Sequence, residues 1–120
     1  MARTIHHLSK CMFIFTFLVP GAPPSNVRAH FTSSTSILVE WDEVPEDKQH
    51  GRIQYYTVVW KRVQGGGPQE TRHVVAPVQQ YELTNLFKYT EYSIQVLAAT
   101  RKGKGPESNP IVTRTDEDSK

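Results

Sequence analysis

Four carboxylates stand close together in one short stretch of the chain, and carboxylate oxygens are the ligands that calcium prefers. They are Asp42, Glu43, Glu46 and Asp47. A calcium loop needs oxygen ligands at alternating positions with a distal glutamate, and this spacing is missing here. Pro45 and Gly51 punctuate the stretch in the way that is typical of a loop. We therefore interpret it as a solvated acidic loop, and we expect no metal and no cofactor.

Catalytic chemistry needs a nucleophile, a base and an orienting group that meet in space. Three histidines follow the N-terminal segment, at His30, His50 and His73, and all fall on predicted loops or strand edges. The chain has no G-x-S-x-G, H-E-x-x-H or phosphate-loop motif, and its glycine run at residues 65–67 precedes no helix that could bind phosphate. We therefore predict that the protein is not an enzyme.

A second charged stretch is basic, with Arg101, Lys102 and Lys104 spaced around a glycine. The whole chain has 14 basic and 12 acidic side chains, and the only charged ones in residues 1–21 are Arg3 and Lys10. The remainder therefore has no net charge. Nucleic-acid binding depends on neutralising many phosphates, so this charge balance predicts no nucleic-acid partner.

Alternating apolar residues predict the strands that must position these charged loops. Tyr92, Ile94 and Val96 share one face of a strand, and the same period of two recurs around residues 37–41 and 53–63. Further strands are expected near residues 27–31, 70–75, 81–86 and 111–115. The expected core consists of Trp41, Tyr56, Val58, Leu86, Tyr92, Ile94 and Val96. The pattern predicts an all-β protein of seven strands.

Tyr92 stands six residues after Leu86, at the start of the most regular predicted strand. This is the pattern of a tyrosine corner, in which the hydroxyl bonds to backbone a few residues upstream while the ring is buried. The alternative is that Tyr92 is only one more core aromatic.

Six segments in order resemble the fibronectin type III family over residues 23 to about 115. They are Pro23-Pro24, SILVEW at 36–41, GRIQYYTVVW at 51–60, YELTNL at 81–86, TEY at 90–92 and GKGP at 103–106. The resemblance implies a seven-stranded antiparallel immunoglobulin-like β-sandwich that is extracellular and serves adhesion or recognition without catalysis. The chain lacks the Arg-Gly-Asp tripeptide, the Trp-Ser-x-Trp-Ser box and the Cys–Trp–Cys core of immunoglobulin domains.

In this architecture the B–C and F–G loops lie at the same end of the sandwich. The candidate partner-binding residues are Glu43, Glu46 and Asp47 in the first loop and Arg101, Lys102 and Lys104 in the second. One interpretation is that the two loops pair with each other across solvent. The other is that the cations contact a protein partner or heparan sulfate, while the acidic loop limits non-specific attraction. The next candidate is the exposed face of the sheet with Lys61, Arg62 and Arg72.

Residues 1–21 are expected to form a signal peptide or a non-native leader. A mildly basic start precedes an apolar run over residues 11–19, which is too short to cross a membrane, and Pro20 ends it. Val19 and Gly21 would suit cleavage before Ala22, so this segment is expected not to pack into the sandwich. The expected domain covers residues 22–115, and residues 116–120 form an acidic tail or linker.

Two function classes remain open. The first is an extracellular or cell-surface protein-binding or spacer module, joined to neighbouring domains of an adhesion or receptor protein. The alternative is a secreted single-domain ligand or decoy.

Overall fold

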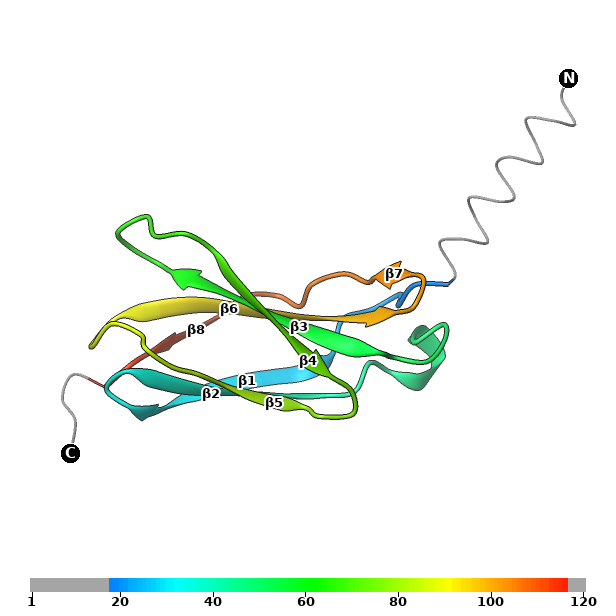
Figure 1. The fold of residues 1–120 in the computed structure, drawn as a ribbon, viewed down its shortest axis with the longest axis horizontal. Coiled ribbons are helices and arrows are strands. Elements are labelled where there is room, and N and C mark those ends of the chain that lie inside the picture. The colour runs from blue at the N-terminus through cyan, green and yellow to red at the C-terminus, as the bar shows by residue number, and fades with distance from the viewer. Residues whose placement is uncertain (1–17, 117–120) are drawn as a thin grey trace, which may run out of the picture.

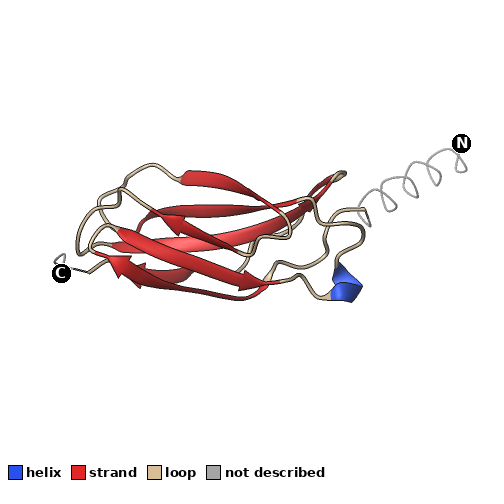
Figure 2. Cartoon of the chain, turned by 60° about the horizontal axis from the view of Figure 1, so that its bottom comes forward, coloured by secondary structure: helices blue, strands red, loops and turns tan. Residues whose placement is uncertain are grey.

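The computed structural model describes residues 18–116, and these form two antiparallel sheets packed face to face (Figure 1, Figure 2). The first sheet has the order β1 (Ser25–Ser33), β2 (Ser36–Asp42) and β5 (Gln80–Leu83). The second sheet runs β4 (Glu70–Val75), β3 (Tyr55–Arg62) and β6 (Glu91–Thr100), with β7 (Gly103–Lys104) and β8 (Ile111–Arg114) both paired to β6. The all-β sandwich predicted from the alternation is confirmed. No helix in this described range is long and apolar enough to cross a membrane.

The last predicted strand, near residues 111–115, is β8, and the structure adds a short strand, β7, within the basic stretch expected to be a loop. β7 pairs with the end of β6 and β8 pairs with its start. Between them, the N–H of Ser108 donates to the carbonyl of Val96 at 2.9 Å, and the Ser108 hydroxyl accepts the Val96 N–H at 2.9 Å. Pro106 and Pro110 flank this serine and have no N–H to donate to a ladder. Between β7 and β8 the Ser108 hydroxyl therefore serves as the acceptor for the Val96 N–H of the central strand.

The core lies between the sheets, and every residue expected there is buried. Their exposed fractions run from 0% to 9%, for Trp41, Tyr56, Val58, Leu86, Tyr92, Ile94 and Val96. The rings of Trp41 and Tyr56 meet with centroids 5.3 Å apart at 58°, a tilted packing that aromatic pairs favour. Burial, and then the nearby charge of Glu43, raise the pKa of the Tyr56 phenol.

The outer face of the second sheet is also covered, which the alternation did not predict. Thr57, Val59 and Leu97 point away from the core and are nevertheless only 2%, 5% and 6% exposed. His73 faces Thr57 in the strand register, and its Nδ1 lies 2.9 Å from the Thr57 hydroxyl. Its ring also packs on Tyr55, with centroids 4.8 Å apart. His73 therefore packs over this outer face of the sheet.

The tyrosine corner is confirmed. The hydroxyl of Tyr92 accepts a hydrogen bond from the backbone N–H of Phe87 at 2.9 Å. Thr115 closes the same corner from the other side: its hydroxyl donates to the Phe87 carbonyl at 2.8 Å and accepts the Thr90 N–H at 3.0 Å. The corner thus ties the start of β6 to the residue after β8.

Candidate functional site

The B–C loop, residues 43–54, and the turn between β6 and β7 lie at the same end of the sandwich, toward the N-terminus of the described chain (Figure 1). The basic stretch expected in the F–G loop is a tight hairpin between β6 and β7. Arg101 and Lys102 form its turn, and Lys104 on β7 pairs with Ala99 on β6. A β-ladder therefore holds the base of this basic stretch, so the three cations project from a fixed scaffold.

The acidic B–C loop is anchored by one buried side chain. Val44 is 1% exposed, and its carbonyl accepts a hydrogen bond from Gln49 Nε2 at 3.0 Å. The short 3-10 helix η1 (Glu46–Lys48) follows, and the candidate acids Glu43, Glu46 and Asp47 are all exposed. Over residues 18–116 no three acids, histidines or cysteines are gathered in a way that could hold a metal.

The two charged loops do not pair with each other in the described chain. Its ion pairs are those of Arg28 with Glu40, at 3.8 Å, and with Asp42, at 3.3 Å. Arg101, Lys102 and Lys104 therefore have no carboxylate partner within residues 18–116, and the mutual-pairing interpretation has no support. The three cations remain open to a partner.

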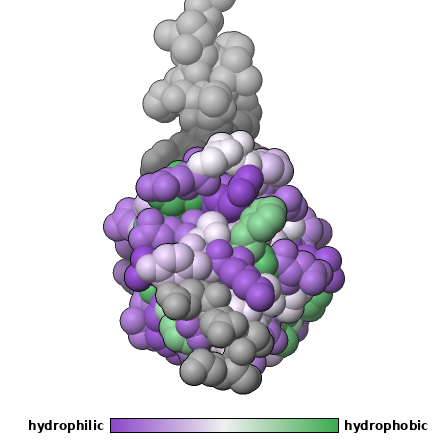
Figure 3. Space-filling model, turned by 90° about the vertical axis from the view of Figure 1, so that its left-hand side faces the viewer, coloured by the Kyte–Doolittle hydropathy of each residue, from purple (hydrophilic) through white to green (hydrophobic). Residues whose placement is uncertain are grey.

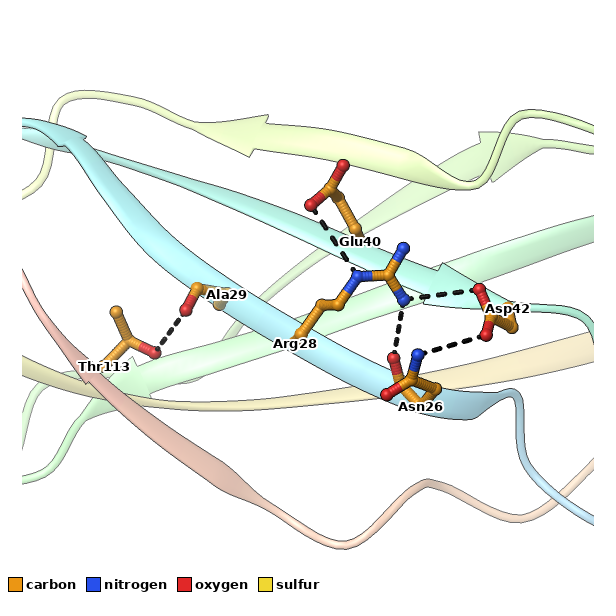
Figure 4. Close-up of polar contacts among 6 residues, drawn as sticks. All are labelled: Asn26, Arg28, Ala29, Glu40, Asp42 and Thr113. Carbon is orange, nitrogen blue, oxygen red and sulfur yellow. Dashed lines mark hydrogen bonds and ion pairs between the residues drawn. The ribbon is translucent and has the colours of Figure 1, made fainter.

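Asp42 was grouped with the acidic loop by sequence, but the structure gives it a different place. Its carboxylate lies on β2 and accepts hydrogen bonds from Asn26 Nδ2 at 3.1 Å and Arg28 Nη1 at 3.3 Å (Figure 4). The bond from Asn26, then that from Arg28, hold the pKa of Asp42 below its usual range. Asp42 therefore links β1 to β2 and does not belong to the acidic surface of the loop.

The expectation that residues 1–21 stay clear of the sandwich is wrong for residues 18–21, while residues 1–17 lie outside the described residues. Pro20 is among the fully buried side chains, and three hydrogen bonds join residues 18–21 to the B–C loop and the end of β6. We call residues 18–21 the entry segment. The available sequence signal was the stiff Pro20-to-Pro24 run, which fixes the chain beside the first strand.

At the opposite end, shown in Figure 3, the surface is largely hydrophilic with a few apolar side chains. The Arg62 guanidinium lies 4.6 Å from the centroid of the Phe87 ring, and that of Arg114 lies 4.7 Å from Tyr89. A Cβ on Gly67 would come within 2.9 Å of Arg62 Nε, so the glycine-rich turn leaves room for this guanidinium.

The other candidate basic site, the sheet face with Lys61, Arg62 and Arg72, also differs from the expectation. Arg62 and Arg72 share the register of the inward-facing Tyr92 and Val58, so they do not lie on the outer sheet face as expected. Arg72 is 5.7 Å from the centroid of the Tyr81 ring. Of the three cations expected there, only Lys61 is presented on that outer face.

Comparison with known proteins agrees with this architecture. Residues 22–114 match the family model of the fibronectin type III domain. The chain is 44% identical over 100 residues to tyrosine-protein phosphatase Lar of Drosophila melanogaster and 42% identical over 101 residues to cell adhesion molecule DSCAM of Homo sapiens. Each alignment covers 83% of this chain and only 5% of the relative.

Two solved structures are similar to it. The crystal structure of the FN5 domain of Drosophila Lar aligns with a TM-score of 0.66 at 35% identity, covering 82% of this chain and 98% of that one. The solution structure of the third fibronectin III domain of human KIAA0343 protein aligns with a TM-score of 0.79 at 26% identity, covering 86% and 88%. Because the family model matches 22–114 and the two-sheet fold agrees, the chain belongs to the fibronectin type III family.

Proposed function

We propose that the chain is a non-catalytic extracellular module of a larger cell-surface adhesion or receptor protein, where it binds a protein partner or spaces neighbouring domains. The observation that supports this most is the kind of relative it matches. The relatives are receptor-type phosphatases and cell adhesion molecules, and the matched region is a small part of each. A module of this kind needs a stable scaffold and an accessible recognition surface.

The proposed recognition surface is the basic hairpin end, made of Arg101, Lys102 and Lys104. All three side chains are exposed and have no carboxylate partner in the described chain. Unpaired cations on a fixed hairpin favour rapid association with an acidic surface and impose its orientation. The acidic Glu43, Glu46 and Asp47 on the neighbouring loop would select against an unpatterned polyanion.

The test is a binding screen of the chain against extracellular proteins and a heparin column, with Arg101, Lys102 and Lys104 all changed to Ala. We expect the variant to lose most of its association rate for the partner that the screen identifies. The loss should shrink at high salt, because surface charge attraction is screened. Stability should change little, since exposed ion pairs and surface charges contribute only about 0–1 kcal/mol.

The matched control removes three exposed cations from the opposite end, by changing Lys61, Lys88 and Arg114 to Ala. If both variants weaken binding equally, overall charge is responsible and the hairpin is not the recognition surface. If the hairpin variant affects heparin retention alone, the partner is heparan sulfate and not a protein.

A further inference from the structure

The entry segment lies in a groove between the B–C loop and the β6–β7 turn, and its backbone is held there by hydrogen bonds. Thr100 Oγ1 donates to the Leu18 carbonyl at 2.6 Å. The Gly21 N–H donates to the Lys48 carbonyl at 2.7 Å. In addition, His50 Nδ1 lies 3.0 Å from the carbonyl oxygen of Val19. Backbone bonds of this kind bind an extended peptide without reference to its side chains.

The groove also accommodates the side chain of Pro20. Pro20 is fully buried, and a Cβ added to Gly105 would lie 2.7 Å from Pro20 Cβ and 2.8 Å from its carbonyl oxygen. Gly105 has no left-handed backbone, so its own conformation does not require glycine. A Cβ on Gly103 would similarly meet Val19 Cγ1 at 3.1 Å. Gly103 has a φ of +154°, which by itself favours glycine, so only the missing side chain of Gly105 is explained by the segment that lies against it.

The groove continues beyond the residues that fill it. A hollow of about 320 Å³ adjoins the entry segment and is lined by Leu18, His50, Gly51, Arg52, Thr100, Arg101 and Lys102. Three of these side chains are cationic. A peptide that extended further along the groove would therefore meet positive charge beside the hairpin.

We propose that this groove is a peptide-binding site for an extended, apolar, proline-containing segment, and that residues 18–21 occupy it in cis. The occupant fixes the direction in which the chain enters the domain, beside Arg101 and Lys102. Cleavage before Ala22 would vacate the site and leave it open to an equivalent peptide. This inference goes beyond the proposed function, although the hollow beside the groove shares Arg101 and Lys102 with the proposed recognition surface.

The first experiment measures thermal unfolding of the 120-residue chain with and without Gly105→Ala. With the segment docked, the added methyl group must displace Pro20, and we expect the midpoint to fall by at least about 4 °C. The matched background replaces Leu18, Val19 and Pro20 with Gly, so that no proline side chain lies against residue 105. Gly105→Ala should shift the midpoint of that background by less than about 1 °C. Equal shifts in the two backgrounds would overturn the docking.

The second experiment tests binding in trans to the background chain, whose groove lacks its own ligand. The probe is a blocked peptide with the sequence of residues 18–23, followed by amide chemical shifts of Thr100, Gly103 and Gly105. A tethered segment stays docked only if its dissociation constant is at or below its effective concentration, which is millimolar for a short linker. We therefore expect saturable shifts with a dissociation constant of roughly millimolar. Gly105→Ala should weaken this binding at least tenfold. Shifts that stay linear or absent up to about 10 mM peptide would overturn the peptide site.

Discussion

The hydroxyl of Tyr92 makes one bond whose removal can be predicted closely. Tyr92→Phe keeps the ring, which is only 4% exposed, and deletes the acceptor for the Phe87 N–H at 2.9 Å. The backbone is held on both sides of this N–H, because the Leu86 N–H donates to the Thr35 carbonyl at 2.9 Å and the Phe87 carbonyl accepts from Thr115 at 2.8 Å. The N–H of Phe87 therefore cannot easily turn toward water. An orphaned buried donor costs about 1–3 kcal/mol.

The exposure of the corner to solvent narrows the expected cost of about 1–3 kcal/mol. The Phe87 side chain is 61% exposed, so water can approach the corner and recover part of the loss. We therefore expect Tyr92→Phe to lower the free energy of unfolding by about 1–2 kcal/mol. For a domain of about 100 residues, each kcal/mol corresponds to a fall of about 4–8 °C in the melting temperature.

Denaturant unfolding followed by tryptophan fluorescence is the suitable assay, because Trp41 is buried in the same core. The midpoint should fall while the dependence on denaturant stays unchanged, as the amount of surface exposed on unfolding is the same. The control is Tyr81→Phe, which deletes a hydroxyl from a ring beside Arg72 and should cost less than about 0.5 kcal/mol. Equal midpoints for Tyr92→Phe and Tyr81→Phe would refute the role of the corner bond.

Three further changes have defined outcomes. Ser108→Ala removes the buried acceptor of the Val96 N–H and should cost about 1–3 kcal/mol in denaturant unfolding, whereas Ser108→Thr, which keeps the hydroxyl, should cost less. Gly67→Ala should displace the Arg62 guanidinium and lower the melting temperature, and the size of the fall should shrink when Arg62 is already Ala. The pKa of Asp42 is lowered in the folded state, so the stability it contributes is present above the unfolded value of about 3.9 and is lost as the pH falls through the folded value. Asp42→Asn should therefore reduce the acid-induced loss of stability below about pH 4, as followed by circular dichroism; an unchanged acid transition would contradict this.

Much of the fold follows from local pattern, because a strand with one buried face must alternate with a period of two. That period placed Trp41, Tyr56 and Ile94 in the core, and the spacing of Leu86 and Tyr92 indicated the corner. The period of two does not predict which group a side chain bonds to. That the Tyr92 hydroxyl would bond to backbone a few residues upstream could be predicted from one short segment, and the structure identifies the Phe87 N–H as the partner.

The remaining features depend on segments that are far apart in the chain. The Ser108 hydroxyl accepts the N–H of Val96, which lies 12 positions earlier on a different element. Gly105 leaves a seat for Pro20, 85 positions earlier, and this cannot be read from either neighbourhood alone. The same limit applies to the candidate site. Sequence predicted that acidic and basic loops would share one end, since strand connectivity decides which loops are neighbours. Only the tertiary structure decided that their charges stay apart and that the entry segment lies between them, because distances between loops are set by how the two sheets pack.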